Sequence, residues 1–526
     1  MSATQEEGGH LRLSLVLAAA MFVLVVDTSL MNVSIAAVVE DLDTTVSSVQ
    51  SAIALEALVS AAFILISSKV GDLFGRKRAY VLGLLGYALG ALAMTVAQSV
   101  TAIIVFWAII GGLGASLLLP AMQSLIHGNF EGAAQKKTYA LVGAAAAIAA
   151  AVGPLIGGFV TTYLSWRVGF LLEAVVIAVV LSQIGLLKDV PYAGDRQVDT
   201  VGAALSVVGM GGVVLGILVW QEGGDYVVLL IAGGSVALWA LARWLVRRHR
   251  DGKMTLLDPD LFRLPHFTVG ISGQMLQNVT LGGAMIALPI FLQIKLEYDA
   301  LETGLSIAPL SLTMFAVAIL AGRTSGRRRP AEVIRGGFAL TALGLVLIIP
   351  IVSRAESGWY LLVPLVIAGA GLGLLVSRLN NYTLAPIDEE RISEAAGVNS
   401  ASGSFGLSFG LAVAGGVLLA TLSLAFTNMT NASPVIPSSQ QQQIAQTLED
   451  DAQVVSNSQL DQLLADEPPA VREEILGINA DATDLALQVA LLVPILAGLL
   501  GLFISFRMVR LPDVKPTAPA EAAALA

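Results

Sequence analysis

The sequence predicts an all-α integral membrane protein, with fourteen transmembrane helices that form two six-helix bundles and two inserted central helices. Two observations of composition carry this prediction. Of the 526 residues, 56% are apolar and only 13% are charged, and the mean hydropathy is +0.79. A soluble domain carries about 25% charged residues, so this chain cannot cover a water-facing surface. The third observation is a series of long apolar stretches.

Each stretch has roughly the 20 mostly apolar residues that an α-helix needs to cross a bilayer. A spanning helix satisfies its own backbone hydrogen bonds, as lipid requires. The first stretch is about 25 residues long, whereas the core of a signal peptide has about 7 to 15, so we expect it to be retained. The fourteen stretches begin near Leu13, Val49, Ala79, Thr101, Tyr139, Trp166, Val201, Tyr226, Phe267, Gly304, Val333, Trp359, Ala395 and Leu485.

Lysine and arginine indicate the orientation, because they accumulate in cytoplasmic loops. When the N-terminus is placed inside, only four of the 29 Lys and Arg residues fall outside: Arg167, Lys295, Arg354 and Arg472. We therefore expect a multi-pass protein of the bacterial inner (plasma) membrane with both termini in the cytoplasm.

An internal repeat divides the chain. The segment Gly71–Arg78, between spans two and three, is echoed by Gly322–Arg329, eight spans later. Two six-helix repeats with two extra helices between them account for this shift, and parallel repeats of this kind surround the central site of many secondary transporters. We expect an N-terminal bundle over 1–190, two inserted helices and a cytoplasmic linker over 191–265, and a C-terminal bundle over 266–526.

The largest segment outside the spans is 427–483, on the outer side. Its apolar residues follow helical spacing, and Pro468-Pro469 interrupts it. We expect a short helical hairpin over the outer mouth, and the alternative is a solvated loop. The spaced pairs are Ile444 with Leu448, Leu460 with Leu464, and Val471 with Ile475.

Three carboxylates lie well within the predicted spans. An ionised carboxylate at the centre of a span costs about 2.5 to 3.5 kcal/mol. Asp27 in span one and Glu56 in span two lie at matching depths, where burial and mutual repulsion favour proton uptake. We interpret both as proton-coupling residues, and the alternative is a structural hydrogen-bonding pair. Glu173 lies near the outer start of span six beside Arg167, and we expect it to reach the interface in a structural role.

Amide side chains form a second candidate site. Gln274, Gln277 and Asn278 in span nine follow the spacing i, i+3, i+4, so they share one helix face. A polar face within a span looks at a cavity or at partner helices. We expect it to meet the Asp27 face across a central cavity and to bind substrate, with helix–helix bonding as the alternative. Asn32 lies about 140° round the helix from Asp27, and we expect it to make a packing bond.

Span five is built almost entirely from small residues. It contains Gly153, Pro154, Gly157 and Gly158 after a run of alanines. Proline removes one helix hydrogen bond, and the absence of side chains lets a neighbouring helix come close. We expect this helix to bend.

Other classes of function are excluded by what the chain lacks. It has no Cys, and its four His residues show no metal spacing. No catalytic constellation or phosphate loop is present, so we expect neither an enzyme nor a cofactor. A net charge of −10 argues against a nucleic-acid partner. We expect small-molecule substrates, protons and the lipid bilayer as partners, and a functional monomer.

Four segments resemble motifs of the fourteen-helix drug:proton antiporters of the major facilitator superfamily. These segments are Val26–Val33 in span one, Ser68–Arg78 in the first repeated loop, Gly153–Gly158 in span five, and Ser165–Arg167 before span six. The resemblance covers essentially the whole chain. It implies a proton-driven exporter that works by alternating access.

The resemblance also implies roles for single residues. Asp27 would exchange protons, and Pro154 with Gly153, Gly157 and Gly158 would govern the bend that closes the cavity. In the loop motif, Asp72 and Arg76, set between Gly71 and Gly75, would form a cytoplasmic latch that holds the outward-open state. These four loop residues and the four of span five are the predicted gating residues.

One departure from the family pattern affects the expected mechanism. Span four of the family usually carries Arg-x-x-Gln, and this chain has Ala108 and Gly111 at those places. With the basic residue missing, we expect Glu56 to take over part of the proton relay and the cavity to favour amphipathic cations or neutral molecules. The alternative reading is an exporter of an endogenous cell-envelope lipid or secondary metabolite.

Overall fold

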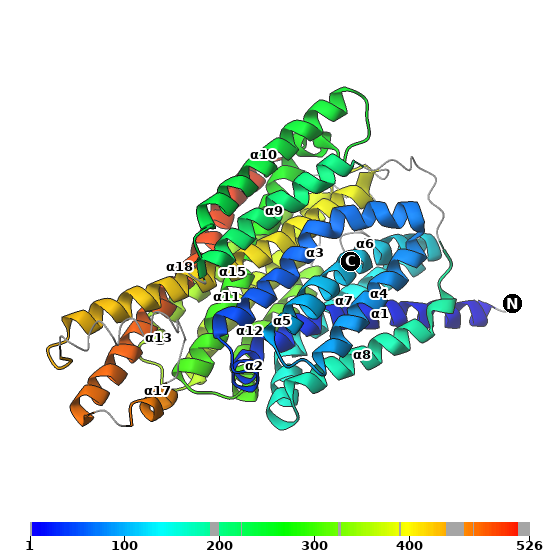
Figure 1. Ribbon diagram of the computed structural model, residues 1–526. Coiled ribbons are helices and arrows are strands. Elements are labelled where there is room, and N and C mark those ends of the chain that lie inside the picture. The colour runs from blue at the N-terminus through cyan, green and yellow to red at the C-terminus, as the bar shows by residue number, and fades with distance from the viewer. Residues whose placement is uncertain are drawn as a thin grey trace.

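The computed structural model describes residues 3–189, 199–221, 224–323, 328–388, 391–437, 457–465 and 468–513. Within these ranges the secondary structure is helical throughout, with no strand (Figure 1). The all-α class predicted from composition is therefore confirmed.

The first part of the chain forms a bundle of long helices joined by short turns. It consists of α1 (Ala3–Val33), α2 (Ile35–Leu42), α3 (Val46–Phe74), α4 (Arg76–Met94), α5 (Val100–Ala102), the π-helix η1 (Ile103–Gly111), α6 (Gly112–Asn129), α7 (Gly132–Tyr163), α8 (Trp166–Ser182) and η2 (Ile184–Leu186).

The rest of the chain follows the same pattern. It consists of α9 (Thr200–Gln221), α10 (Val227–Arg250), η3 (Pro259–Arg263), α11 (Pro265–Ile290), η4 (Phe291–Lys295), α12 (Ala300–Arg323), α13 (Pro330–Val352), η5 (Gly358–Leu361), α14 (Leu362–Leu384), α15 (Ile392–Ala432), α17 (Asn457–Leu463) and α18 (Pro469–Arg510).

Thirteen helices of the described chain are long and apolar enough to cross a membrane. They account for every predicted span except the third. That span coincides with α4, which has only 19 residues and begins with Arg76, Lys77 and Arg78. Three charges in so short a helix leave little apolar length, so the count of fourteen stays a prediction.

Two helix pairs join the halves of the molecule: α7 packs against α12, and α3 packs against α15. Helix α9 lies against both α3 and α15, and α10 lies outside α9 at the edge of the bundle (Figure 1). The outer surface of α10 is apolar and exposed, as at Val228 and Trp239, which suits a lipid-facing helix. The predicted domain boundaries are not tested by these contacts.

The two ends of the bundle are named here by their chain turns. The basic end is where α3 passes into α4, and the far end is where α1 passes into α3. At the far end, Gln293 of η4 donates to the carbonyl of Val33 (2.8 Å) and accepts from the amide of Ala36 (3.0 Å). The amide of Leu301 in α12 donates to Thr162 Oγ1 of α7 at 3.1 Å. These bonds tie the two halves together at the far end.

Helices α15 and α18 extend past the other helices at this end, with α17 beside them (Figure 1). Phe426 of α15, Leu460 of α17, and Val471 and Ile475 of α18 are buried together in one apolar cluster. An ion pair between Arg472 and Asp461 (2.5 Å) links α18 to α17. The predicted pair Ile444 and Leu448 lies outside the described residues.

Candidate functional site

A cavity of about 340 Å³ lies in the middle of the molecule, between α1, α3, α6 and α7 on one side and α11, α12 and α15 on the other. This volume is within the range of about 300 to 1,000 Å³ that is usual for small-molecule sites. Its lining comprises Met21, Leu24, Val25, Thr28, Ser29, Asn32, Glu56, Ala57, Ser60, Ala115, Leu119, Ala150, Asn278, Leu281, Met285, Ser311, Met314, Ser404, Leu407 and Leu411.

The lining is apolar with a few polar groups. Glu56 is its one acidic residue, and the described lining contains no Lys, Arg or His. Asn32 and Asn278 add amides from opposite sides. Unbranched, flexible methionines adapt to ligands of different shape, and Met21, Met285 and Met314 project from three different helices. Such a surface suits amphipathic ligands that carry a positive charge or none.

Glu56 reaches the cavity from α3, and its residue is half-buried. The backbone of α6 packs close to it because a glycine stands at the contact: a Cβ at Gly112 would lie 3.0 Å from the carbonyl oxygen of Glu56. Glu56 therefore combines partial shielding from water with access to the cavity.

Asp27 does not line the cavity. Its side chain is buried (1% exposed) on the opposite face of α1, where Tyr87 donates a hydrogen bond to Oδ2 and Trp107 Nε1 donates to both carboxylate oxygens at 3.0 and 2.9 Å. The expectation that the Asp27 face meets the amide face of span nine across the cavity is thus wrong. The two donors are neutral, so Asp27 is not locked in an ion pair with either.

Asn32 lines the cavity, although the sequence predicts only a packing bond for it. Asn32 and Asp27 face different surroundings, as predicted, but Asn32 is the one that faces the cavity. Its Nδ2 donates to the carbonyl of Thr28 at 2.7 Å, while its buried Oδ1 has no partner. An amide oxygen without a partner is costly to bury, so Asn32 places an unsatisfied polar atom in the wall of the cavity.

Trp107 and Tyr87 are the site residues that sequence reasoning missed. Trp107 lies in η1, where π-helical turns shift the register relative to an α-helix, and such segments are frequent at functional sites. Buried tryptophan and tyrosine usually find a hydrogen-bond partner for their polar atom. Tyr87 and Trp107 lie in two consecutive predicted spans, and their polar atoms could have been recognised from the sequence as candidate partners of a buried acid.

Glu173 is buried inside the helix bundle and does not reach its surface. Its residue is 3% exposed, and neither carboxylate oxygen has a hydrogen-bond partner. Arg167, its expected neighbour, instead forms an ion pair with Asp41 (2.5 Å) and donates to the carbonyl of Ala97 (2.5 Å). The expectation that Glu173 reaches the interface is therefore wrong, and its structural role stays a prediction.

Two of the three amides of α11 share a face, as the spacing predicts. A Cβ at Gly403 of α15 would lie 3.3 Å from Asn278 Nδ2 and 3.6 Å from Gln274 Nε2. Asn278 also lines the cavity, and its Nδ2 donates to the carbonyl of Gln274 at 3.0 Å. Gln277 is buried outside the described lining, and its Oε1 lacks a donor. Of the three, only Asn278 therefore lines the cavity.

The small residues of α7 contact both neighbouring helices. A Cβ at Gly153 would lie 2.6 Å from the Cβ of Ser29, and one at Gly157 would lie 2.8 Å from the Cα of Leu30, both in α1. On the other side, a Cβ at Gly158 would lie 2.4 Å from the carbonyl oxygen of Ala300 in α12. Helix α7 is therefore wedged between the halves at the far end.

Pro154 completes this contact. Its carbonyl oxygen lies where a Cβ on Gly304 of α12 would come within 2.2 Å. Glycine is thus required on both helices for their backbones to approach so closely.

The repeated loop forms the turn from α3 to α4. Gly75 adopts φ +102°, a conformation that strains any residue with a Cβ. The backbone amide of Lys77, next to Arg76, donates to Asp189 Oδ1 at 3.1 Å, and Lys77 Nζ donates to the carbonyl of Leu187 at 2.6 Å. Gly71 is buried at the end of α3. The side chain of Asp72 lies outside the described residues, so its predicted latch is not tested.

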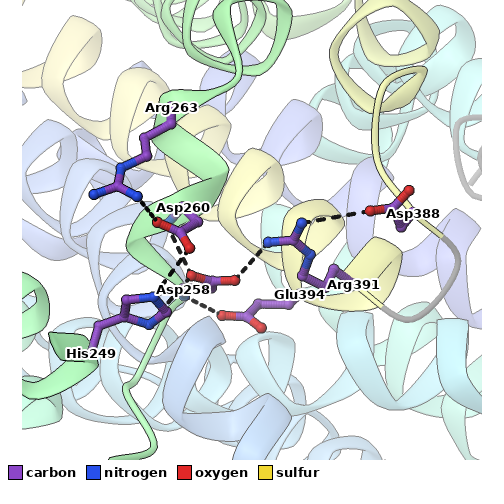
Figure 2. Close-up of polar contacts among 7 residues, drawn as sticks. All are labelled: His249, Asp258, Asp260, Arg263, Asp388, Arg391 and Glu394. Carbon is purple, nitrogen blue, oxygen red and sulfur yellow. Dashed lines mark hydrogen bonds and ion pairs between the residues drawn. The ribbon is translucent and has the colours of Figure 1, made fainter. Parts of the chain in front are cut away.

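A polar cluster at the basic end joins α10 to the start of α15 (Figure 2). Asp258 lies at its centre: its carboxylate accepts from Arg391 Nη1 at 2.8 Å and from the amide of Asp260 at 2.9 Å. His249 Nε2 lies 3.1 Å from Asp260 Oδ2, and the amide of Asp258 donates to Glu394 at 2.5 Å.

The charges of this cluster favour a structural network of ion pairs over a metal site. Partial burial alone would raise the pKa of Asp258, but the Asp260 amide and the Arg391 guanidinium together lower it. His249, Asp258 and Asp260 are close enough to share a metal ion. Arg391 and Arg263 already neutralise the two carboxylates, however (2.8 Å each), so the set is better suited to holding helices together.

Comparison with known proteins gives one consistent result. A family model described as "Major Facilitator Superfamily" matches residues 17–198 and 200–411. The chain is 28% identical over 400 residues to "Probable actinorhodin transporter" of Streptomyces coelicolor, which covers 74% of this chain and 69% of that protein. It is 27% identical over 410 residues to "Multidrug resistance protein Stp" of Mycobacterium tuberculosis, covering 77% and 75%.

The architecture is shared more widely than the sequence. A solved structure described under "Structural insights into substrate recognition in proton dependent oligopeptide transporters" superposes with a TM-score of 0.58 at 17% identity, covering 95% of this chain and 99% of that one. At this identity the likeness concerns the fold alone.

Proposed function

The chain belongs to the major facilitator superfamily, and from this premise we propose that it exports amphipathic small molecules, cationic or neutral, in exchange for protons by alternating access. One observation carries the proposal: a single carboxylate, Glu56, faces an apolar cavity at the junction of the two halves. A carboxylate there can hold either a proton or the positive charge of a substrate. The relatives named for multidrug resistance and for an actinorhodin transporter support the export direction.

The proposed site combines one residue in the cavity with one behind it. Glu56 exchanges a proton directly with the cavity, and Asp27, held by Tyr87 and Trp107, exchanges a proton within the N-terminal half. The missing basic residue of span four, at Ala108, leaves neutral donors in its place. Asn278, together with Asn32 on the opposite wall, orients the substrate; Gln274 and Gln277 support the α11–α15 contact from behind.

The driving force is sufficient for this exchange. One proton moving through about 150 mV supplies roughly 3.5 kcal/mol, which sustains a concentration gradient of about 300-fold. A monocation exchanged for one proton moves no net charge and uses only the pH difference. Two titrating carboxylates allow two protons per cation, which restores the electrical contribution.

We propose that the protein works as a monomer in the bacterial inner membrane. We place both termini in the cytoplasm because only four of the 29 Lys and Arg residues then fall outside. The basic end is then cytoplasmic and the far end extracellular. Gating is assigned to the α7–α12 contact around Gly153, Pro154, Gly157 and Gly158. The loop residues Gly71, Asp72, Gly75 and Arg76 act as the cytoplasmic latch.

The variant Glu56→Gln tests the role of the cavity carboxylate. It preserves the size of the side chain but cannot carry the second proton, so we expect efflux of an ethidium-like dye to lose its dependence on membrane potential while exchange driven by a pH difference continues. The attainable dye gradient should fall by up to about 300-fold at 150 mV. The measurement is dye flux in liposomes with the potential and the pH difference imposed separately.

Glu131→Gln is the matched control for this experiment, because Glu131 is an exposed acid at the start of α7. It should leave both driving forces effective. If Glu56→Gln transport still responds to potential as the unmodified protein does, Glu56 is not the second proton site.

The far-end extension of α15, α17 and α18 favours a second candidate, export of an endogenous cell-envelope lipid or secondary metabolite. A molecule handed to the envelope needs an extracellular element, and this extension has its own apolar cluster. Deleting residues 438–467 with a short Gly-Ser bridge keeps α15 and α18. A dye exporter should retain most of its flux, whereas a lipid exporter should lose release at the outer surface. Parallel assays of dye and lipid release in one vesicle preparation distinguish the two.

A further inference from the structure

Glu173 is a buried acid to which the proposed exchange cycle assigns no role. It lies in the middle of α8, is 3% exposed, and both of its carboxylate oxygens lack a hydrogen-bond partner among the described residues. A polar group buried in this way costs about 1 to 3 kcal/mol, and more when charged. A leucine at this position would avoid this desolvation cost, so the carboxyl group destabilises the fold unless it has a function.

Glu173 lies in the same group of packed helices as Asp27. Helix α8 packs against α1, which carries Asp27, and against α4, which carries Tyr87. Phe170, one turn before Glu173, meets the ring of Trp107 edge-on at 6.2 Å between centroids. Glu173 and Asp27 are close enough for their charges to interact, and Tyr87 interacts with both.

The charged groups around this pair are acidic. Glu56 of α3 also interacts with Asp27 and Tyr87. The basic residue of α8, Arg167, is directed to Asp41 and to the carbonyl of Ala97 at the far end. Among the described residues, neither Asp27 nor Glu173 takes part in an ion pair.

Two neighbouring carboxyls without a cation cannot both ionise in a medium of low dielectric constant, so they titrate as a pair. The donors are distributed unequally. Asp27 receives hydrogen bonds from Tyr87 and Trp107, which stabilise its charged form, whereas Glu173 receives none. The shared proton therefore belongs on Glu173 when Asp27 is charged.

We propose that Glu173 is a proton-binding residue of the exchange cycle, paired with Asp27 inside the N-terminal half and outside the substrate cavity. This inference rests on the proposed function. One proton passes between the two carboxyl groups, leaving one carboxyl and one carboxylate before and after the step, and no other reactant takes part. The pair carries a proton that never competes with substrate for the cavity, while Glu56 carries the one that does.

The variant Glu173→Gln tests the pair. Without the neighbouring carboxyl, Asp27 must bind its proton alone, against two donors that favour its charged form. We expect the pH profile of proton-linked dye efflux to move toward acid by roughly one pH unit, with dye affinity at alkaline pH unchanged, because Glu173 does not line the cavity. Glu173→Asp keeps a carboxyl at a greater distance and should give an intermediate profile. Glu131→Gln is the control.

A purely structural role for Glu173 predicts a different result: less folded protein or a lower melting temperature, with a pH profile that superposes on that of the unmodified protein. That result overturns the inference. If Glu173→Gln does not fold, Glu173→Asp decides alone, and an unshifted profile again overturns it. Failure of the proposed function is recognised separately, because dye efflux by the unmodified protein would then not respond to a pH gradient at all.

Discussion

Replacing Asp27 by Asn should abolish proton-linked efflux while the protein still folds. Asparagine with its oxygen at the place of Oδ2 still accepts from Tyr87 and from Trp107 Nε1 and loses only the second bond of Trp107, to Oδ1, so α1 stays linked to α4 and η1. It cannot bind or release a proton, however. If the pair with Glu173 carries one proton of each cycle, every cycle is interrupted, and we expect dye efflux at the level of vesicles without protein.

The experiment compares everted vesicles that contain equal amounts of folded protein, judged by size-exclusion chromatography in detergent. Asp43→Asn is the matched control. Asp43 is an exposed residue at the end of α2 with φ +48°, and asparagine tolerates that conformation as aspartate does. Its transport should be unchanged. Undiminished efflux by Asp27→Asn would remove Asp27 from the mechanism.

Replacing Gly158 by Val should have the second large effect, on the conformational change. A Cβ at this position would lie 2.4 Å from the carbonyl oxygen of Ala300, so the backbones of α7 and α12 must separate at the far end. Overpacking of this kind costs about 1 to 3 kcal/mol, which shifts a two-state equilibrium by about 5- to 150-fold. We expect transport to fall in that range and the far end to open.

The absence of cysteine from the chain allows spin labels to be placed at will. Val96→Cys and Trp359→Cys mark exposed far-end positions in the two halves, 74% and 79% exposed. The distance between the labels should lengthen in Gly158→Val and stay unchanged in Gly336→Val, because a Cβ at Gly336 meets nothing within 4 Å. An unchanged distribution in Gly158→Val would contradict a gate at this contact.

Sequence alone identified the helical membrane class and nearly every span, because lipid requires long runs of apolar residues and such runs are visible in one dimension. The exception, α4, shows the limit of this signal. Its first turn contains three basic residues, so its length and apolarity do not distinguish it from a helix outside the membrane.

The sequence predicts a common depth for Asp27 and Glu56 but not the direction in which each side chain points. Glu56 faces the cavity, whereas Asp27 is buried on the face of α1 that points away from it. A helix packed on all sides buries polar groups toward several neighbours, so the position of a residue along a span does not say which neighbour it faces. Asp27 and Asn32 face different surroundings, as the sequence predicts, but Asn32 and not Asp27 faces the cavity.

The partners of the buried acids depend on contacts between distant spans. The reach of Trp107 to Asp27 depends on the π-helical register of η1, which no hydrophobic pattern specifies. Nearness in sequence places Glu173 beside Arg167, whereas Arg167 of α8 pairs with Asp41 of the distant helix α2. At Glu173, nearness in sequence is therefore a poor guide to the contacts of a buried acid.

We expect protons and substrate to move in opposite directions through this protein. The direct measurement uses the purified protein in liposomes that contain a pH-sensitive dye, with no pH difference or potential at the start. When a cationic substrate is added on one side, protons should move toward that side at a rate proportional to substrate uptake, and neither flux should occur in the double variant Asp27→Asn, Glu56→Gln. Substrate uptake without any change of internal pH, or proton movement that persists in the double variant, would contradict this expectation.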